Sequence, residues 1–340
     1  MVALIPCHNF GSRLGILLVL AFLAALSAVP VRAFDLPDWS VPDLADHPLV
    51  GTVWTGSGNG ANLSEMAKAA ESARHVLVGE IHPNADHHTI QAAIIAALVQ
   101  ADRRPTIVFE MIPNRLDGAL QAFVKSGSKD SDALGEAVDW SKRGWPDWSI
   151  YRPIGDVALE HGLPMRAGNI DRSLMREIGR KGLAALAASQ TSRFGLDNRL
   201  PPQDETALRK VLYEGHCRVI PEAALGPMVL VQRTRDGSLA DAMLRADNPD
   251  GTVLIAGAGH VRKDWAVPAV LASRAPQETV LSIALIEVED GRNKFADYTF
   301  GADGPAPFDF VLFTPRSETG DRCAGLKERF DRKKSSTTGN

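Results

Sequence analysis

The feature that most constrains this chain is a Gly-x-x-His motif that occurs twice, each time directly after a short apolar run. Gly79-Glu80-Ile81-His82 follows Val76-Leu77-Val78. Gly257-Ala258-Gly259-His260 follows Val253-Leu254-Ile255-Ala256. Such runs are typical of strands buried on both faces, so both histidines are expected just beyond the C-terminal ends of strands. Ligands bind at that edge in open α/β sheets, and two imidazoles there indicate a metal site, a haem site or a general base.

Strands and helices alternate along most of the chain. Further buried strands are expected at about 106–109, 164–167, 279–288 and 308–313. Helices are expected at about 64–73, from 86 onward, and at 115–125, 131–142, 153–161, 172–188, 204–217, 222–245 and 265–274, with Ser64 and Asp86 as N-caps of the first two. This alternation predicts an α/β fold with a mainly parallel sheet, helices on both faces and an active edge at the strand C-termini.

The chain is expected to divide into four segments. Residues 1–33 have the pattern of a secretory signal peptide, because Arg13 precedes an apolar run and small residues lead to a cleavage site near Ala33. Residues 34–63, rich in Pro, Gly, Asn and Asp, are expected to form an irregular N-terminal arm. The α/β domain then covers 64–325, and 326–340 is expected to be a flexible tail.

Charge and cysteine content narrow the function classes. The formal net charge of −4 gives no support for nucleic-acid binding. Once Cys7 leaves with the signal peptide, Cys217 and Cys323 remain. Either they form a disulfide that ties the C-terminal segment to the middle of the domain, or they stay as two thiols. Two cysteines so far apart are not a zinc-site pattern.

Two carboxylates are candidates to work with the first motif histidine. Glu80 and His82 alternate along an extended segment and so share a face. A carboxylate beside an imidazole either helps to bind a metal or orients the ring as a base. Glu110, between Phe109 and Met111, closes the next strand, where a charge is costly unless it is paired. Glu110 is therefore a ligand or base beside His82, or half of a structural ion pair.

Two more histidines begin the helix after the first motif. His87 lies one turn before the apolar stripe that contains Ile90 and Ile94, so its ring is expected to point toward His82. His88 is rotated about 100° from His87 on the helix and is expected to face inward less. His87 is either a third imidazole ligand or a core residue.

Around the second motif histidine, several polar side chains have two interpretations. Gln232 and Asp236 fall on the apolar stripe of the helix at 222–245, flanked by Arg233 and Arg235. They form either a polar network that supports the site or a buried helix contact. Arg262 binds a carboxylate or is a surface residue. The tryptophan-rich segment 140–152, which contains Tyr151, is either core or the wall of a cofactor site.

In these motifs the chain resembles the ChaN-like haem-binding uptake family of the Tiki/TraB and erythromycin-esterase superfamily. The first motif carries the resemblance together with His87-His88 and Gln91. Further blocks match in order over about 48–325: Phe109-Glu110-Met111, Trp145-Pro146, Tyr151-Arg152-Pro153-Ile154, Gly168-Asn169, His216-Cys217, Gln232-Arg233, Arg235-Asp236, Gly257 to Arg262, Asp309-Phe310-Val311 and Thr314-Pro315.

The resemblance implies an α/β protein of the cell envelope, here expected to be soluble in the periplasm, with haem or another small molecule as its ligand. ChaN-like members are associated with haem binding and iron uptake. On that hypothesis the imidazoles near His82, His87 and His260 line the pocket. Haem lies there or between two protomers of a homodimer, and partners of envelope uptake are implied. The residues assigned to haem binding are His87, His88, Tyr151, Arg152 and Arg262, with the two arginines on the propionates.

The same resemblance also implies hydrolysis, because Tiki-like members are metal-dependent proteases and the esterase branch activates water. On that alternative, a divalent metal held by His82, Glu110 and His260 lowers the pKa of bound water. Glu80 then acts as the base, and Arg262 or Asn169 stabilises the oxyanion. The residues expected to support the site from behind are Asn169, Gln232, Arg233 and Asp236. A third interpretation is a partner-binding protein that keeps an inert site.

Overall fold

The computed structural model describes residues 1, 35–301, 304–317 and 323–325. The predicted signal peptide, apart from Met1, and the predicted tail at 326–340 lie outside the described residues. The compact unit described below belongs to the segment Val31–Asn340. Among the described residues, no helix combines the length and apolar character needed to cross a bilayer.

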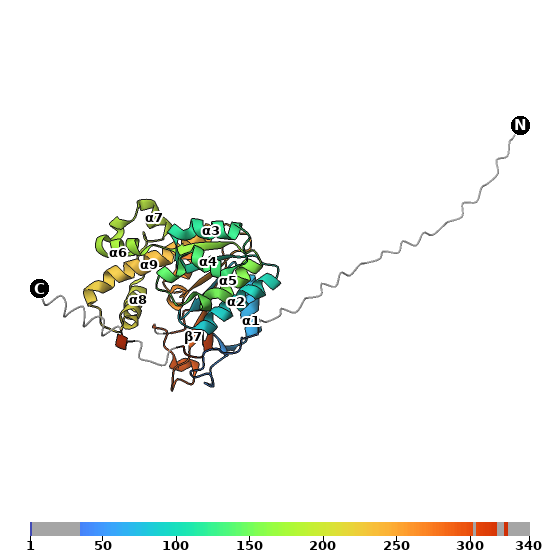
Figure 1. Ribbon diagram of the computed structural model, residues 1–340. Helices are drawn as coiled ribbons and strands as arrows, with labels where there is room; N and C mark the ends of the chain where they lie inside the picture. Colours follow the sequence, from blue (N-terminus) through green and yellow to red (C-terminus); the bar gives the residue numbers. More distant parts are fainter. Residues whose placement is uncertain (2–34, 302–303, 318–322, 326–340) are drawn as a thin grey trace. The chain divides into compact units, whose positions relative to one another are not determined.

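A single mixed sheet organises the described part of the chain (Figure 1). Its eight strands run in the order β2-β1-β8-β7-β3-β6-β4-β5. The strands from β3 to β8 are all parallel to one another, whereas β1 is antiparallel to both β2 and β8. The strands are β1 Val53–Thr55, β2 Gly60–Ala61, β3 His75–Glu80, β4 Thr106–Pro113, β5 Met165–Asn169, β6 Thr252–Gly257, β7 Val280–Glu287 and β8 Phe310–Thr314. The predicted mainly parallel α/β sheet is confirmed.

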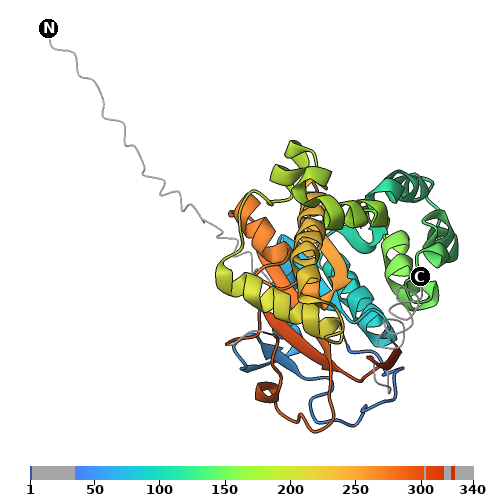
Figure 2. The ribbon, with the colours of Figure 1, turned by 90° about the vertical axis from the view of Figure 1, so that its left-hand side faces the viewer.

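Helices cover both faces of this sheet. They are α1 Leu63–Ser72, α2 Ala85–Gln100, α3 Asp117–Lys125, α4 Ser131–Ala137, α5 Trp148–Glu160, α6 Arg172–Lys181, α7 Ala188–Arg193, α8 Pro202–Gly215, α9 Glu222–Leu244 and α10 Val267–Arg274. In Figure 1, α2 and α5 lie together on one side, with α8 and α9 on the other. Figure 2 looks onto α8, α9 and α10.

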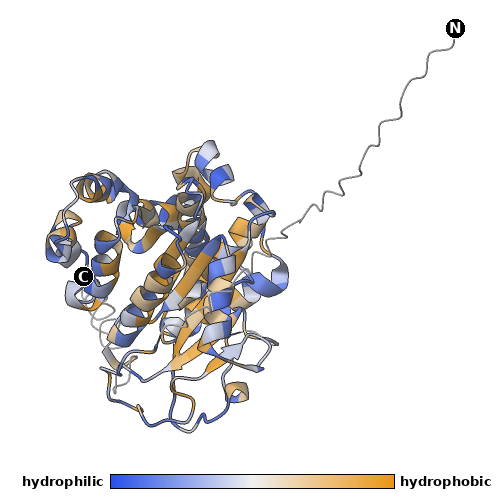
Figure 3. Cartoon of the chain, turned by 90° about the vertical axis from the view of Figure 1, so that its right-hand side faces the viewer, coloured by the Kyte–Doolittle hydropathy of each residue, from blue (hydrophilic) through white to orange (hydrophobic). Residues whose placement is uncertain are grey.

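Alternating strand residues supply the two cores. Val76 and Val78 of β3 belong to the core that also contains Ile90 of α2. Leu77 between them belongs to the opposite core with Leu239 of α9. Side chains of a strand point to opposite faces in turn, so an unbroken apolar run is what a strand covered on both faces requires. Figure 3 shows these strands as a hydrophobic band between helices with hydrophilic outer faces.

The register of β3 and β6 places the two Gly-x-x-His motifs side by side. β3 pairs with β6 in parallel, with Gly79 opposite Ala256 and Glu80 opposite Gly257. A side chain on Gly79 would collide with Val261 and Ala258, since an added Cβ would lie 2.4 Å from the Val261 side chain. The glycine of the first motif therefore permits the turn after β6 to pack directly against β3.

Some local predictions were wrong at the ends of elements. The N-cap of α1 is Asn62 rather than Ser64: Asn62 Oδ1 accepts from Glu65 N at 3.0 Å, and Glu65 accepts in return from Asn62 N at 2.9 Å. The N-cap of α2 is Asn84 rather than Asp86. Asp86 instead accepts hydrogen bonds from Ser40, at 2.9 Å from its backbone N. In both cases an asparagine two residues earlier supplies the cap.

Three longer segments also differ from expectation. The arm at 34–63 contains β1 and β2, which extend the sheet edge beside β8 and so are not irregular. The helix expected at 131–142 stops at Ala137 and is followed by a 3-10 turn at Trp140–Lys142, because Asp139 has a left-handed φ of 51°. The helix expected at 172–188 ends at Lys181, where Gly182 has a positive φ of 63°.

The two remaining cysteines are bonded to each other. Cys217 and Cys323 form a disulfide with Cα atoms 5.4 Å apart. Of the two alternatives that the sequence left open, the structure therefore has the disulfide, which joins the end of α8 to the C-terminal segment.

Candidate functional site

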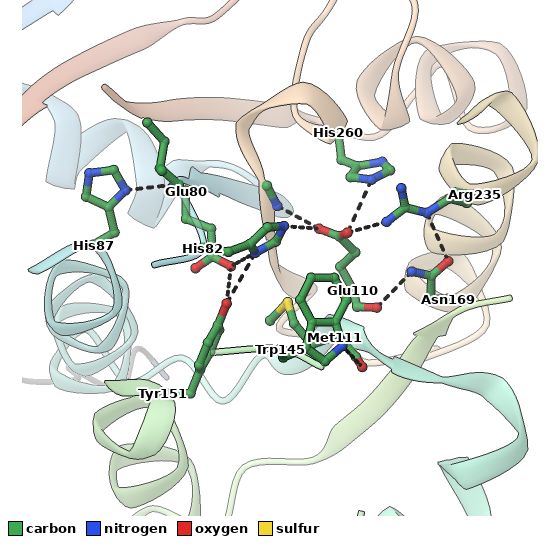
Figure 4. A network of polar contacts seen from close by, with 12 residues as sticks. Glu80, His82, His87, Glu110, Met111, Trp145, Tyr151, Asn169, Arg235 and His260 are labelled. Atoms are coloured by element: carbon green, nitrogen blue, oxygen red, sulfur yellow. Dashed lines mark hydrogen bonds and ion pairs between the residues drawn. The ribbon is translucent and has the colours of Figure 1, made fainter. Parts of the chain in front are cut away.

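Three neighbouring strands bring the motif histidines and Glu110 to one edge of the sheet. The strand order there is β3-β6-β4. His82 lies two residues beyond β3, and His260 ends the 3-10 turn Ala258–His260 that follows β6. Glu110 was expected to close its strand, but β4 continues to Pro113; Glu110 directly follows the last β4 residue that pairs with β6. Figure 4 shows the carboxylate of Glu110 between the two imidazoles. The strand C-termini thus form the polar edge that the motifs predict.

His82 is held from behind by a carboxylate and a hydroxyl. Its Nδ1 lies 2.8 Å from Glu80 Oε1 and 3.2 Å from the Tyr151 hydroxyl. Tyr151 is fully buried and donates to the same Glu80 oxygen at 3.0 Å. The other ring nitrogen, Nε2, is 3.8 Å from Glu110 Oε2, which is too far for a hydrogen bond. The His82 side chain is 28 % exposed and its ring packs against Trp145.

His260 has the same arrangement on the other side. Its Nδ1 lies 2.5 Å from Asp236 Oδ1 and 3.2 Å from Gln232 Nε2, both on α9. Its Nε2 is 3.4 Å from Glu110 Oε1. A carboxylate on Nδ1 fixes the orientation of an imidazole and leaves Nε2 to face the reacting group or ligand. The two histidines therefore present their Nε2 atoms to one glutamate from opposite sides.

Glu110 is buried but fully partnered. Its Oε2 accepts the backbone N–H of Gly257 at 2.7 Å, and Arg235 of α9 pairs with Oε1. Asn169, at the end of β5, donates to the Glu110 carbonyl at 3.0 Å and accepts from Arg235 Nε at 3.4 Å. These contacts offset the cost of burying a carboxylate among apolar strands.

The buried charges shift one another's pKa values. Burial alone would raise the pKa of Glu80, but the positive charge of His88 and the bond from His82 outweigh it and bring that pKa to about 2. Burial alone would also raise the pKa of Glu110, but the nearby His260 and His82 outweigh burial and hold that pKa well below its ordinary value. In turn, Glu110 overcomes the effect of burial and raises the pKa of His82 and, helped by Asp236, that of His260 to about 9. Glu80 and Glu110 therefore stay ionised at neutral pH, and His260 stays protonated.

Both histidines of α2 are completely buried, although His88 was expected to face inward less than His87. His87 Nδ1 accepts from Ile81 N at 2.9 Å, and its Nε2 lies 2.7 Å from Thr314 Oγ1. His88 Nε2 lies 3.0 Å from the carbonyl oxygen of His82. Its Nδ1 is 2.6 Å from Glu80 Oε2, a contact with the geometry of an ion pair rather than a hydrogen bond. The two rings hold the turn that carries His82.

Three of the predicted arginine positions lie outside this cluster. Arg152 is exposed and pairs with Asp132 and Asp156. Arg262 is buried against Trp265 and paired with Asp264, with a further bond to a backbone carbonyl. Arg233 donates to the carbonyl of Asn198. None of these bonds reaches the two motif histidines.

The arginine that does reach Glu110 was not selected from the sequence. Arg233 and Arg235 flank the stripe of Gln232, Asp236 and Leu239 on opposite sides of α9. Helical spacing alone therefore does not choose between them, and the packing of α9 on β4 and β5 brings Arg235 to Glu110. Trp145 was not assigned a role in the site from the sequence, yet its indole donates to the Met111 carbonyl at 3.0 Å and its ring contacts His82.

The donors for a metal are close together but not arranged as a ready site. Within the described part of the chain, no group of three or more His, Cys, Asp or Glu side chains has an arrangement that would hold a metal ion. Arg235 and His260 approach the same oxygen of Glu110. The assignment of a metal to His82, Glu110 and His260 stays a prediction.

A cavity of about 470 Å³ opens beside the cluster. Its lining includes the polar residues Glu110, Asn169 and Arg235 and the apolar residues Met111 and Trp145. This volume falls within the range of about 300–1,000 Å³ that is typical of small-molecule sites.

Comparison with known proteins identifies the family. Residues 66–271 match the family described as haem-binding uptake, Tiki superfamily, ChaN. The chain belongs to this ChaN family. A search of curated proteins finds no match. The structure is similar to one described as cofacial haem binding to ChaN of Campylobacter jejuni, at 18 % identity and a TM-score of 0.61, over 76 % of this chain and 95 % of that one.

A more distant likeness lies in the esterase branch. It is to a mutant of the erythromycin esterase EreC in its open conformation, at 13 % identity and a TM-score of 0.45, over 80 % of this chain and 99 % of that one. At these identities, the likeness to the ChaN structure shows a shared fold, and membership of the ChaN family rests on the family match over 66–271.

Proposed function

We propose that this protein binds haem at the Glu110 edge of the sheet, with His82 as the axial donor. The observation that carries the proposal is the state of its ring: Nδ1 is held by Glu80 at 2.8 Å, while Nε2 makes no hydrogen bond and the side chain is 28 % exposed. A histidine with a carboxylate on one nitrogen and a free second nitrogen is the usual form of a protein ligand to a metal. Family membership supports the same ligand class.

The other candidate donors fit less well. His87 and His88 are completely buried and hydrogen-bonded on both ring nitrogens. Tyr151 is also completely buried, and its hydroxyl is engaged with Glu80. Among these side chains His82 alone combines exposure with a free nitrogen. When bound, haem would bring the iron that the uptake family handles; this chain would hold it through His82 and shield one face with Trp145.

A haem titration of purified protein tests this assignment. The Soret band is followed for the wild type, for His82→Ala and for His161→Ala, an exposed histidine at the end of α5 that controls for adsorption to surface imidazoles. We expect saturable binding that His82→Ala weakens and His161→Ala leaves unchanged. Equal affinity in all three proteins, or no binding by the wild type, would contradict the proposal.

A second function is favoured by one specific feature, the convergence of two carboxylate-backed histidines on Glu110. His82 with Glu80 and His260 with Asp236 each have the histidine–carboxylate pairing of general acid–base catalysis. Arg235 and Asn169 lie where they would stabilise a developing negative charge. The described donors do not form a metal site, so this second function relies on the protein groups alone.

This alternative makes a separate prediction. Hydrolysis of an ester probe, p-nitrophenyl acetate, would be lost in His260→Ala and would be insensitive to a chelator. If His82→Ala and His260→Ala both hydrolysed the ester as fast as His161→Ala, the cluster would not be the catalyst for this probe.

A further inference from the structure

The cavity beside Glu110 has an unbalanced charge. Among the described residues that line it, the cationic ones are Arg115, Lys142, Arg143, Arg172, Arg176 and Arg235, and the carboxylates are Glu110 and Asp171. Both carboxylates already have a partner, since Glu110 pairs with Arg235 and Asp171 with Arg115 at 2.8 Å. Lys142 pairs with Asp139 outside the lining. Three guanidinium groups remain around the cavity with no carboxylate within ion-pair distance in the described part of the chain.

Arg143 is the most telling of the three because it is buried. It is only 8 % exposed, and its bonds go to backbone carbonyls, from Nη1 to Met111 at 2.6 Å and from Nε to Asp139 at 3.3 Å. Its Nη2 is buried and has no hydrogen-bond partner among the described residues. A buried cation with an unused donor is costly unless an anion meets it. Burial and the nearby charge of Arg115 lower the pKa of Arg143 to about 10, which reflects the same imbalance.

The start of α6 adds to the positive potential. Asp171, the N-cap of α6, makes no side-chain cap bond, so the first backbone N–H groups of this ten-residue helix are not satisfied by it. Asp171, Arg172 and Ser173 all line the cavity. A helix N-terminus attracts anions through these N–H groups and the helix dipole. Arg172 also donates to the Arg143 carbonyl at 2.5 Å, which links the helix start to the buried arginine.

We propose that this cavity is an oxyanion site that binds the carboxylate or phosphate groups of a small ligand, with Arg143, Arg172, Arg176 and the first backbone N–H groups of α6 as its contacts. Met111 and Trp145 give the adjoining wall an apolar character suited to the body of such a ligand. Where the ligand is haem, the inference rests on the proposed function and assigns the propionates to these arginines instead of Arg152 and Arg262. The site itself does not depend on haem.

The first arm of the test compares haem with haem dimethyl ester, in which both carboxylates are blocked. The variants are Arg143→Gln and the double change Arg172→Gln with Arg176→Gln, which alters exposed residues only. Arg180→Gln, one turn further along α6 and outside the cavity, is the matched control. We expect Arg143→Gln to weaken haem binding by about tenfold or more. The ester should bind all four proteins alike.

The second arm uses inorganic phosphate and needs no haem. Thermal unfolding is followed in phosphate and in sodium chloride of equal ionic strength, because a ligand of the folded state raises the midpoint. We expect phosphate to stabilise the wild type and Arg180→Gln but not the double variant. If haem fails to bind, the proposed haem function fails while this arm still decides on the oxyanion site.

The two arms also distinguish the source of the anion. A phosphate response together with equal binding of haem and its ester would assign the site to a separate small anion. The inference is overturned if the arginine variants change neither the preference for haem over its ester nor the response to phosphate.

Discussion

The three tyrosines of this chain form a natural series that tests the buried network around His82. Tyr151 is completely buried and donates its hydroxyl proton to Glu80 at 3.0 Å. Tyr298 is 8 % exposed and accepts a neutral backbone N–H from Glu289 at 2.8 Å. Tyr213 is partly exposed, and its hydroxyl has no hydrogen bond among the described residues. Changing each to phenylalanine removes one oxygen atom and leaves the ring packing in place.

The magnitudes follow from the hydroxyl partners. A hydrogen bond to a charged group contributes about 1.5–3 kcal/mol to stability, and one between neutral groups about 0.5–1.5 kcal/mol. Glu80 keeps two histidine partners when the Tyr151 hydroxyl is lost, so we expect Tyr151→Phe to lower the free energy of unfolding by about 2 kcal/mol. Tyr298→Phe should cost about 1 kcal/mol and Tyr213→Phe close to none. Burial and the charge of Glu80 raise the pKa of Tyr151, so its hydroxyl stays a donor throughout.

Urea unfolding at pH 7 measures these differences as shifts in the midpoint at constant slope. The series is internally controlled, because all three changes remove the same atom. A cost for Tyr151→Phe that equals the cost for Tyr213→Phe would refute the view that the Glu80 network stabilises the folded chain.

Three other perturbations have defined outcomes. The pKa of His260 is about 9, above the ordinary value of about 6.5. The contribution of its protonated ring to stability is therefore complete below about pH 6.5 and is lost as pH rises through about 9. Urea unfolding from pH 6 to 10 should show this loss of stability, and Asp236→Asn should make the loss smaller. Glu110 and Glu80 raise the pKa of His82. Because a protonated imidazole cannot bind iron, haem affinity should rise with pH. Soret titrations of Glu80→Gln should show this rise in affinity at lower pH than in the wild type. The Cys217–Cys323 disulfide closes a loop with a sequence separation of 106. Cys323→Ser should therefore lower the free energy of unfolding by up to about 4 kcal/mol. Equal urea midpoints for the wild type with and without reductant would contradict this stabilisation.

Much of the fold was predictable from the sequence because the relevant signals are local. The run Val76-Leu77-Val78 must be buried on both faces wherever it lies, so it predicts a central strand without knowledge of its neighbours. The same reasoning places His82 and His260 beyond strand ends, and the structure agrees. The caps of α1 and α2 were misjudged because Asn62 and Asn84 compete with nearby side chains of similar capping strength.

The sequence by itself determined that His82 and His260 follow the ends of buried strands, because apolar runs and glycines act within a few residues. Only the tertiary structure decided that β6 lies between β3 and β4, which brings His82, His260 and Glu110 together from segments far apart in the chain. It also decided that Arg235 rather than Arg233 reaches Glu110, and that Arg143 is buried beside the start of α6. Strand order and the closure of long loops depend on contacts between distant segments, and no local pattern contains that information.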